Sequence, residues 1–128
     1  MIRLPAAIGA LFGMTAVLLG AFGAHVLEAR VSAERLEVWA TASHYLAWHA
    51  TTLLFVGLGT GRRLNRWLLS AAAWCLTVGI AVFSGSLYLL VLTDQAGWGA
   101  VTPIGGVLLA IGWAFLAAAI AGARPETS

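Results

Sequence analysis

Residues 67–93 read WLLSAAAWCLTVGIAVFSGSLYLLVLT, and this stretch contains no Asp, Glu, Lys or Arg. An α-helix needs about 20 predominantly apolar residues to cross the hydrocarbon core of a bilayer, so the stretch is long enough for one crossing. A membrane-spanning barrel strand would instead alternate apolar and polar residues over about 10 positions. Because backbone N–H and C=O groups must be hydrogen-bonded internally where water is absent, the stretch predicts a transmembrane helix.

Three further stretches share this apolar character, so the sequence predicts four helices in a single domain over residues 1–128. The predicted helices cover about residues 4–27, 33–60, 66–93 and 102–122. The loops between them are short, which makes neighbouring helices antiparallel. The predicted fold class is therefore all-α, an integral membrane four-helix bundle.

The composition of the whole chain supports a membrane protein and excludes several other classes. The 128 residues are 61% hydrophobic and only 9% charged, whereas a soluble domain carries about 25% charged residues. This excludes an ordinary soluble enzyme, a nucleic-acid-binding module and a disordered tail. The single cysteine, Cys75, excludes an intrachain disulfide and a metal site built from cysteines of this chain alone. The lipid bilayer is the first expected partner.

The arginines are distributed unevenly and predict the orientation of the chain. Two of the seven lie between the first and second helices, and the other five would lie on the opposite side of the membrane. These five are Arg3, Arg62, Arg63, Arg66 and Arg124. Cytoplasmic segments are enriched in Lys and Arg, so we expect both termini in the cytoplasm. Trp39 and Trp98 are then expected as anchors at the outer interface, and Trp67 at the inner one.

Small residues recur at short spacing along the first helix, at Gly9, Gly13, Ala16, Gly20 and Ala24. Such ladders allow two helix backbones to approach closely. We expect Gly13 and Gly20 to lie in a tight contact within the bundle, so that leucine at either position destabilises it. A second possibility is that part of the ladder faces another copy of the chain or another subunit of a larger membrane complex.

Polar side chains gather in the half of the helices predicted to lie near the outer surface. Unpaired polar groups are costly in hydrocarbon, so they should point into the bundle. We expect one outward-facing polar pocket, with His25, Tyr45, His49, Ser84, Ser86, Tyr88 and Thr102 as candidate ligand-binding residues. His49 should lie deepest, with its ring inside the bundle and Ser84 as its favoured hydrogen-bond partner.

These residues could in principle form a metal site, a haem site or a catalytic pair, but the spacing or the surroundings argue against each. His44 and His49 are five residues apart, so on a regular helix they point about 140° away from each other and cannot chelate one ion. Haem ligation by His25 and His49 requires both at one depth, yet His25 lies near the surface. A Ser84–His49 nucleophile pair has no carboxylate within the membrane to orient it. We therefore assign no catalytic residue and no metal ligand.

An equally simple hypothesis is purely structural. The polar groups would hydrogen-bond one another across the helices and specify the bundle, at about 1 kcal/mol each. In that case they line no ligand site.

Four ordered strings in the chain are similar to a known family. They are Gly20-Ala-Phe-Gly-Ala-His25, Tyr45-Leu-Ala-Trp-His49, Phe83-Ser-Gly-Ser-Leu-Tyr88 and Thr102-Pro-Ile-Gly-Gly106. From about Gly9 to Ala117 the chain resembles the domain-of-unknown-function 423 family (DUF423), the YgdD/YwdK-like small inner-membrane proteins. The family motifs match at His25, Tyr45, His49, Ser84, Gly85, Ser86, Tyr88, Thr102, Pro103 and Gly105, and His44 stands outside them. The resemblance implies a multi-pass protein of the bacterial cytoplasmic (inner) membrane and implies no biochemical activity.

Together these observations favour a small binding or accessory membrane protein over an enzyme. Its polar pocket would hold a lipid headgroup, a quinone-like molecule or a partner helix. The alternative is a redox, metal-dependent or haem-dependent membrane enzyme, or a subunit of one, that uses His25 and His49. The residues name no cofactor, and nucleic acid is not an expected partner.

Overall fold

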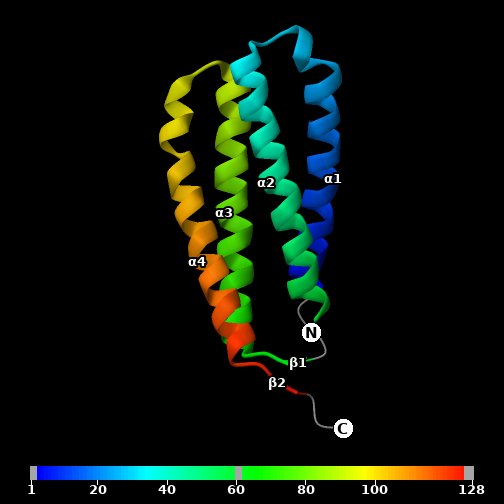
Figure 1. Cartoon of the computed structure of the whole chain (residues 1–128), viewed down its shortest axis with the longest axis vertical. Helices are drawn as coiled ribbons and strands as arrows, with labels where there is room; N and C mark the ends of the chain where they lie inside the picture. The colour runs from blue at the N-terminus through cyan, green and yellow to red at the C-terminus, as the bar shows by residue number, and fades with distance from the viewer. Residues whose placement is uncertain (1–2, 60–61, 126–128) are drawn as a thin grey trace.

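The computed structural model describes residues 3–59 and 62–125 and contains four long helices (Figure 1). They are α1 (Arg3–His25), α2 (Ala33–Leu58), α3 (Arg66–Thr93) and α4 (Thr102–Ala121). Short 3-10 helices, η1 (Leu27–Ala29) and η2 (Ala96–Ala100), lie in the α1–α2 and α3–α4 connections. The predicted all-α fold is confirmed. The predicted end of the second helix, at residue 60, lies outside the described residues, and α2 ends at Leu58.

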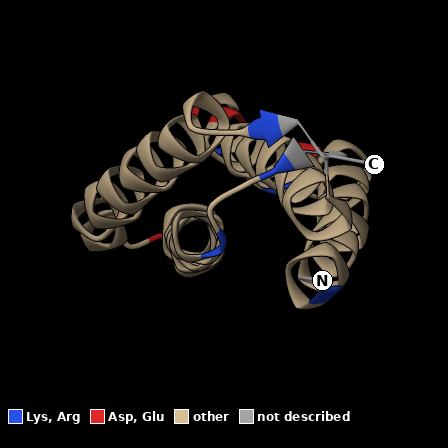
Figure 2. Ribbon diagram, turned by 90° about the horizontal axis from the view of Figure 1, so that it is seen from below, with Lys and Arg blue, Asp and Glu red and all other residues tan. Residues whose placement is uncertain are grey.

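The helices follow one another as antiparallel neighbours, and α1 and α4 lie on opposite sides of the central α2–α3 pair (Figures 1 and 2). The main contacts join α1 to α2, α2 to α3 and α3 to α4. Within the described residues, α1 and α4 make no close backbone contact. The bundle is therefore open, and its two outer helices leave most of their surface to the bilayer.

Three segments are long and apolar enough to cross a membrane, namely Arg3–Ala29, Arg66–Thr93 and Ala96–Ala121. Among the described residues, α2 does not reach this level of hydropathy, because it carries two histidines and several hydroxyl side chains. It has a similar length to its neighbours and packs between α1 and α3. Two of its polar side chains, Ser43 and His49, are buried. The polar helix thus lies in the middle of the fold, where other helices cover it.

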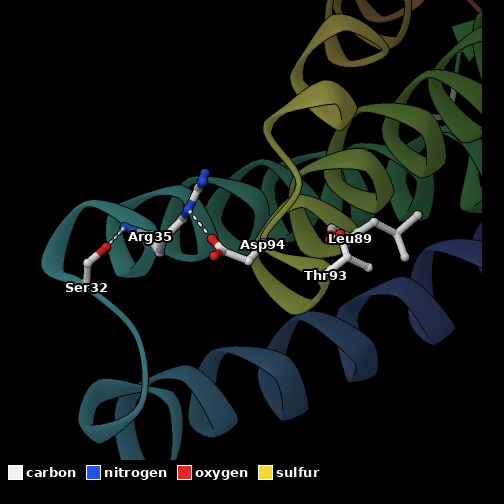
Figure 3. A network of polar contacts seen from close by, with 5 residues as sticks. All are labelled: Ser32, Arg35, Leu89, Thr93 and Asp94. Carbon is white, nitrogen blue, oxygen red and sulfur yellow. Dashed lines mark hydrogen bonds and ion pairs between the residues drawn. The ribbon is translucent and has the colours of Figure 1, made fainter.

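The end of the molecule that carries η1 and η2, which we call the loop end, is held by local polar contacts. The Ser32 hydroxyl accepts a hydrogen bond from the Arg35 backbone N–H at 3.1 Å and caps α2. Arg35 also forms an ion pair with Asp94, with 3.2 Å between Nε and Oδ1 (Figure 3). Asp94 ends α3 in the left-handed conformation, with φ of 54°. The ion pair therefore joins the start of α2 to the end of α3.

The opposite end, which we call the terminal end, carries a short backbone pairing that the sequence did not predict. Strand β1 (Arg62–Arg63) pairs antiparallel with β2 (Arg124–Pro125). Strands of two residues have no hydrophobic period by which a sequence could reveal them. The pairing places arginines from two distant segments side by side (Figure 2). Whether this end faces the cytoplasm stays a prediction.

Close helix contacts occur at different glycines from those predicted. A Cβ atom added at Gly9 would lie 2.7 Å from the Ala50 carbonyl oxygen, so the α1 and α2 backbones touch there. A Cβ at Gly13 would meet only the Ala50 Cβ, at 4.0 Å, and one at Gly20 would meet nothing within 4 Å. The prediction of tight packing at Gly13 and Gly20 is therefore wrong, because no large side chain of α2 reaches them.

Trp39 also differs from its predicted role as an interfacial anchor. Its side chain is only 2% exposed, and its Nε1–H donates a 2.7 Å hydrogen bond to the Leu19 carbonyl oxygen. Its ring meets the Tyr88 ring edge-on, with centroids 4.5 Å apart. The prediction for Trp39 is wrong because the partly diverging helices leave room for an indole between α1, α2 and α3. Trp67, by contrast, is exposed at the start of α3.

Candidate functional site

His49 is held by two protein groups, and the geometry determines which of its nitrogens carries the proton. Its Nδ1 lies 2.7 Å from the Tyr45 carbonyl oxygen, and its Nε2 lies 3.0 Å from Nε1 of Trp113. An indole N–H only donates, so Nε2 must accept and Nδ1–H must donate to the carbonyl. The arrangement requires neutral His49 in the Nδ1–H tautomer. The ring is buried, 5% exposed, and connects α2 to α4.

Ser84 is not the partner of His49, so that expectation is wrong. The Ser84 hydroxyl donates to the Ala42 carbonyl oxygen at 2.8 Å and joins α3 to α2 instead. Sequence reasoning missed Trp113 as the true partner. The missed signal was the indole N–H of Trp113, a hydrogen-bond donor in the apolar middle of α4.

The remaining predicted residues are divided among separate contacts. The Tyr88 hydroxyl lies 2.8 Å from the hydroxyl of Ser43, a residue that sequence reasoning did not single out. The Ser86 and Thr102 hydroxyls lie 2.6 Å apart and join α3 to α4. His25 is exposed at the end of α1. The structure therefore does not bring the seven candidates together around one polar pocket.

Tyr45 and His49 do lie together, at a recess between α2, α3 and α4 that we call the aromatic recess. Its volume is about 580 Å³, and its lining residues are Tyr45, Trp48, His49, Phe83, Gly106, Leu109 and Trp113. The Tyr45 ring stacks on the Phe83 ring with centroids 4.6 Å apart and lies 5.1 Å from the Trp48 ring. Trp48 and Trp113 are exposed to the surroundings of the bundle. The recess is therefore open on the side of Trp48 and Trp113, which faces the surroundings of the bundle.

A second and larger hollow, the α1–α2 groove, runs between the first two helices. Its volume is about 740 Å³. Small residues dominate its walls, and polar groups are few. The lining residues are Gly9, Ala10, Gly13, Ala16, Val17, Gly20, Gly23, Ala24, Glu28, Leu36, Trp39, Ala40, Ser43, His44, Ala47, Ala50, Thr51 and Leu54. The predicted small-residue ladder of α1 therefore lines an open groove.

The histidines are poorly placed for a shared metal or haem. Both ring nitrogens of His49 are engaged by Tyr45 and Trp113. His25 does not line the aromatic recess. In the part of the chain that the structure describes, no group of three or more His, Cys, Asp or Glu residues is close enough to hold a metal ion.

Comparison with known proteins adds the family to this geometry. The model of a family described as "protein of unknown function (DUF423)" matches residues 19–106, from the end of α1 to the start of α4. The chain belongs to the DUF423 family. Of the aromatic recess, Leu109 and Trp113 lie beyond the matched segment.

Relatives of this DUF423 protein carry names that state a membrane location. A UPF0382 membrane protein of Staphylococcus aureus (strain bovine RF122) is 47% identical over 85% of this chain and 88% of its own length. The UPF0382 membrane protein YwdK of Bacillus subtilis is 39% identical over 88% of this chain and 91% of its own length. No solved structure matches the chain significantly. The protein is thus a small helical membrane protein of a family whose function is unknown.

Proposed function

We propose that this DUF423 protein is a binding protein of the bacterial cytoplasmic membrane that holds a planar, quinone-like lipophilic molecule in the aromatic recess. The observation that carries the proposal is the lining of that recess. Four aromatic rings and the His49 imidazole surround a hollow of about 580 Å³ that opens toward the bilayer. Ligand sites for small molecules have volumes of about 300–1,000 Å³ and predominantly apolar, aromatic linings with few polar groups.

The stacking geometry supports a flat ligand. Tyr45 and Phe83 are already stacked, with an angle of 29° between their planes. Aromatic pairs in offset or edge-on arrangements gain about 0.5–1.5 kcal/mol beyond the burial of their surface. A planar ring that enters from the bilayer would extend this stack and shield Trp48 and Trp113 from the acyl chains.

One polar group in the recess remains available to a ligand. Within the described residues, the Tyr45 hydroxyl makes no hydrogen bond, although its ring is packed on three aromatic neighbours. A phenolic O–H donates readily to a carbonyl oxygen, and a quinone presents such an oxygen at its ring edge. His49 has no free nitrogen and serves to hold the Trp113 indole in place. These roles favour binding over a redox or metal-dependent enzyme that uses His25 and His49.

Quenching of tryptophan fluorescence by decylubiquinone, added to the full chain in detergent micelles, tests the proposal. We expect saturable quenching in the parent protein. Gly106→Leu should abolish it, because a Cβ at Gly106 meets only Phe83, at 4.0 Å, so leucine fills the recess without a backbone clash. Tyr45→Phe should weaken binding by about 2- to 12-fold, which corresponds to one hydrogen bond of about 0.5–1.5 kcal/mol.

Gly85→Leu is the matched control, since a Cβ at Gly85 meets nothing within 4 Å and Gly85 does not line the recess. This variant should bind the quinone like the parent. Linear, unsaturable quenching in the parent, or equal quenching in Gly106→Leu and Gly85→Leu, would show that the quinone merely partitions into the micelle.

A further inference from the structure

The α1–α2 groove is closed at Gly9, near the terminal end, and open around Gly20. At Gly9 the two backbones touch, with 2.7 Å from an added Cβ to the Ala50 carbonyl oxygen. At Gly13 the nearest atom is a side-chain carbon at 4.0 Å, and at Gly20 there is none within 4 Å. At Gly23 the Trp39 side chain brings the two helices into contact again, 2.5 Å from an added Cβ. The α1 and α2 ribbons diverge toward the loop end (Figure 1).

The groove is open because small residues face small residues. Gly13, Ala16 and Gly20 of α1 lie opposite Ala40 and Ala47 of α2, and all five line the same hollow. Protein interiors are normally packed without voids of this size. A groove of about 740 Å³ on a membrane-embedded surface must therefore be filled from outside the chain.

The shape of the groove favours an acyl chain over another helix. A helix with its side chains is about 10–12 Å wide, which is more than the closed end of the groove leaves free. This groove closes at Gly9, where α1 and α2 are in backbone contact. A flexible acyl chain can follow a groove that is closed at Gly9 and open around Gly20.

One carboxylate, that of Glu28, lies at the loop end of the groove. Glu28 lines it and has no ion-pair partner among the described residues. His44 also lines the groove, about 7.5 Å nearer the terminal end than Trp39 at 1.5 Å per residue. The Glu28 carboxylate at this mouth matches the ammonium of a lipid headgroup.

We propose that the α1–α2 groove binds an aminophospholipid, with one acyl chain between α1 and α2 and the headgroup ammonium at Glu28. This site is separate from the aromatic recess, and the proposal does not depend on the quinone-binding function. A lipid with an anionic glycerol headgroup offers Glu28 no cation and would be bound less well.

Native mass spectrometry of the full chain, released from detergent after incubation with dioleoyl phosphatidylethanolamine, tests the proposal. We expect one retained lipid per chain, and less retention of dioleoyl phosphatidylglycerol with the same acyl chains. Gly20→Leu should lower the bound fraction about fivefold or more, because its side chain occupies the groove. Gly85→Leu and Gly106→Leu, which lie outside the groove, should retain the lipid.

The headgroup contact is tested by a second pair of variants. Glu28→Gln should reduce retention of the phosphatidylethanolamine by about two- to fivefold, as expected for one partly exposed ion pair. Glu34→Gln, an exposed change outside the groove, should leave retention unchanged. Equal retention by Gly20→Leu and Gly85→Leu would overturn the site. A parent dimer that Gly20→Leu converts to a monomer would also overturn it, because a second copy would then fill the groove.

Discussion

The two helical hairpins, α1–α2 and α3–α4, both place glycines at their interfaces, but the first leaves an open stretch around Gly20 between tight contacts at Gly9 and Gly23. In α3–α4, a Cβ at Gly105 would lie 2.5 Å from the Phe83 backbone nitrogen, and one at Gly112 would lie 2.9 Å from the Leu76 side chain. In α1–α2, Gly9 is equally tight, whereas Gly20 has no neighbour. A glycine creates a tight contact only where the facing helix supplies a large side chain or its own backbone.

The largest expected effect concerns the orientation of the two hairpins in the membrane, because each turn lies either outside or in the cytoplasm. Both hairpins turn at the loop end, so reporters placed in the 28–37 and 94–97 stretches must agree. We expect both to report the outside of the cytoplasmic membrane, and a fusion at Ser128 to report the cytoplasm, because five of the seven arginines belong to the terminal end of the molecule. A cytoplasmic signal from the 28–37 stretch would contradict the predicted orientation.

The next largest effect concerns the α3–α4 hairpin. Gly105→Leu forces a side chain into the α3 backbone and should lower the free energy of unfolding in micelles by about 3 kcal/mol. Gly20→Leu in the open stretch of the α1–α2 hairpin should change it by less than about 0.5 kcal/mol, as a surface substitution does. Chemical unfolding followed by circular dichroism measures both. Equal destabilisation by the two variants would mean that the α1–α2 hairpin also closes at Gly20.

A smaller effect on stability is expected at the hydrogen bond between His49 of α2 and Trp113 of α4, which joins the two hairpins. Trp113→Phe keeps an aromatic ring but leaves Nε2 of His49 without a donor, and should lower the free energy of unfolding by about 0.5–1.5 kcal/mol. Trp74→Phe is the control, because Trp74 is exposed. Chemical unfolding followed by circular dichroism measures this effect. A free energy of unfolding that Trp113→Phe leaves unchanged would argue against the hydrogen bond between Trp113 and His49.

The smallest effect is expected at the loop end. Asp94→Asn removes the ion pair with Arg35 while keeping a residue that tolerates the left-handed conformation. Asp94 is 83% exposed, so the loss should be only about 0.2–1 kcal/mol and should vanish in high salt. A salt-independent loss would show that Asp94 acts through the α3 terminus and not through the ion pair.

The candidate site was only partly predictable, and the residues show why. The pattern placed Tyr45 and His49 in one polar pocket, and both line the aromatic recess. It also grouped Ser84 with His49, yet Ser84 bonds to the Ala42 carbonyl. A backbone carbonyl of a neighbouring helix is present at every position, so residue types alone do not reveal which one accepts a hydroxyl.

Local chemistry determined the four helices, because an uncharged apolar stretch of sufficient length has one stable form in a bilayer. It also determined the family and the arginine-rich end. Tertiary structure alone decided which glycines are tight, why Trp39 is buried, and that Trp113 holds His49. These depend on the rotation and divergence of helix pairs, which follow from the summed packing of many side chains and not from the spacing along any single helix.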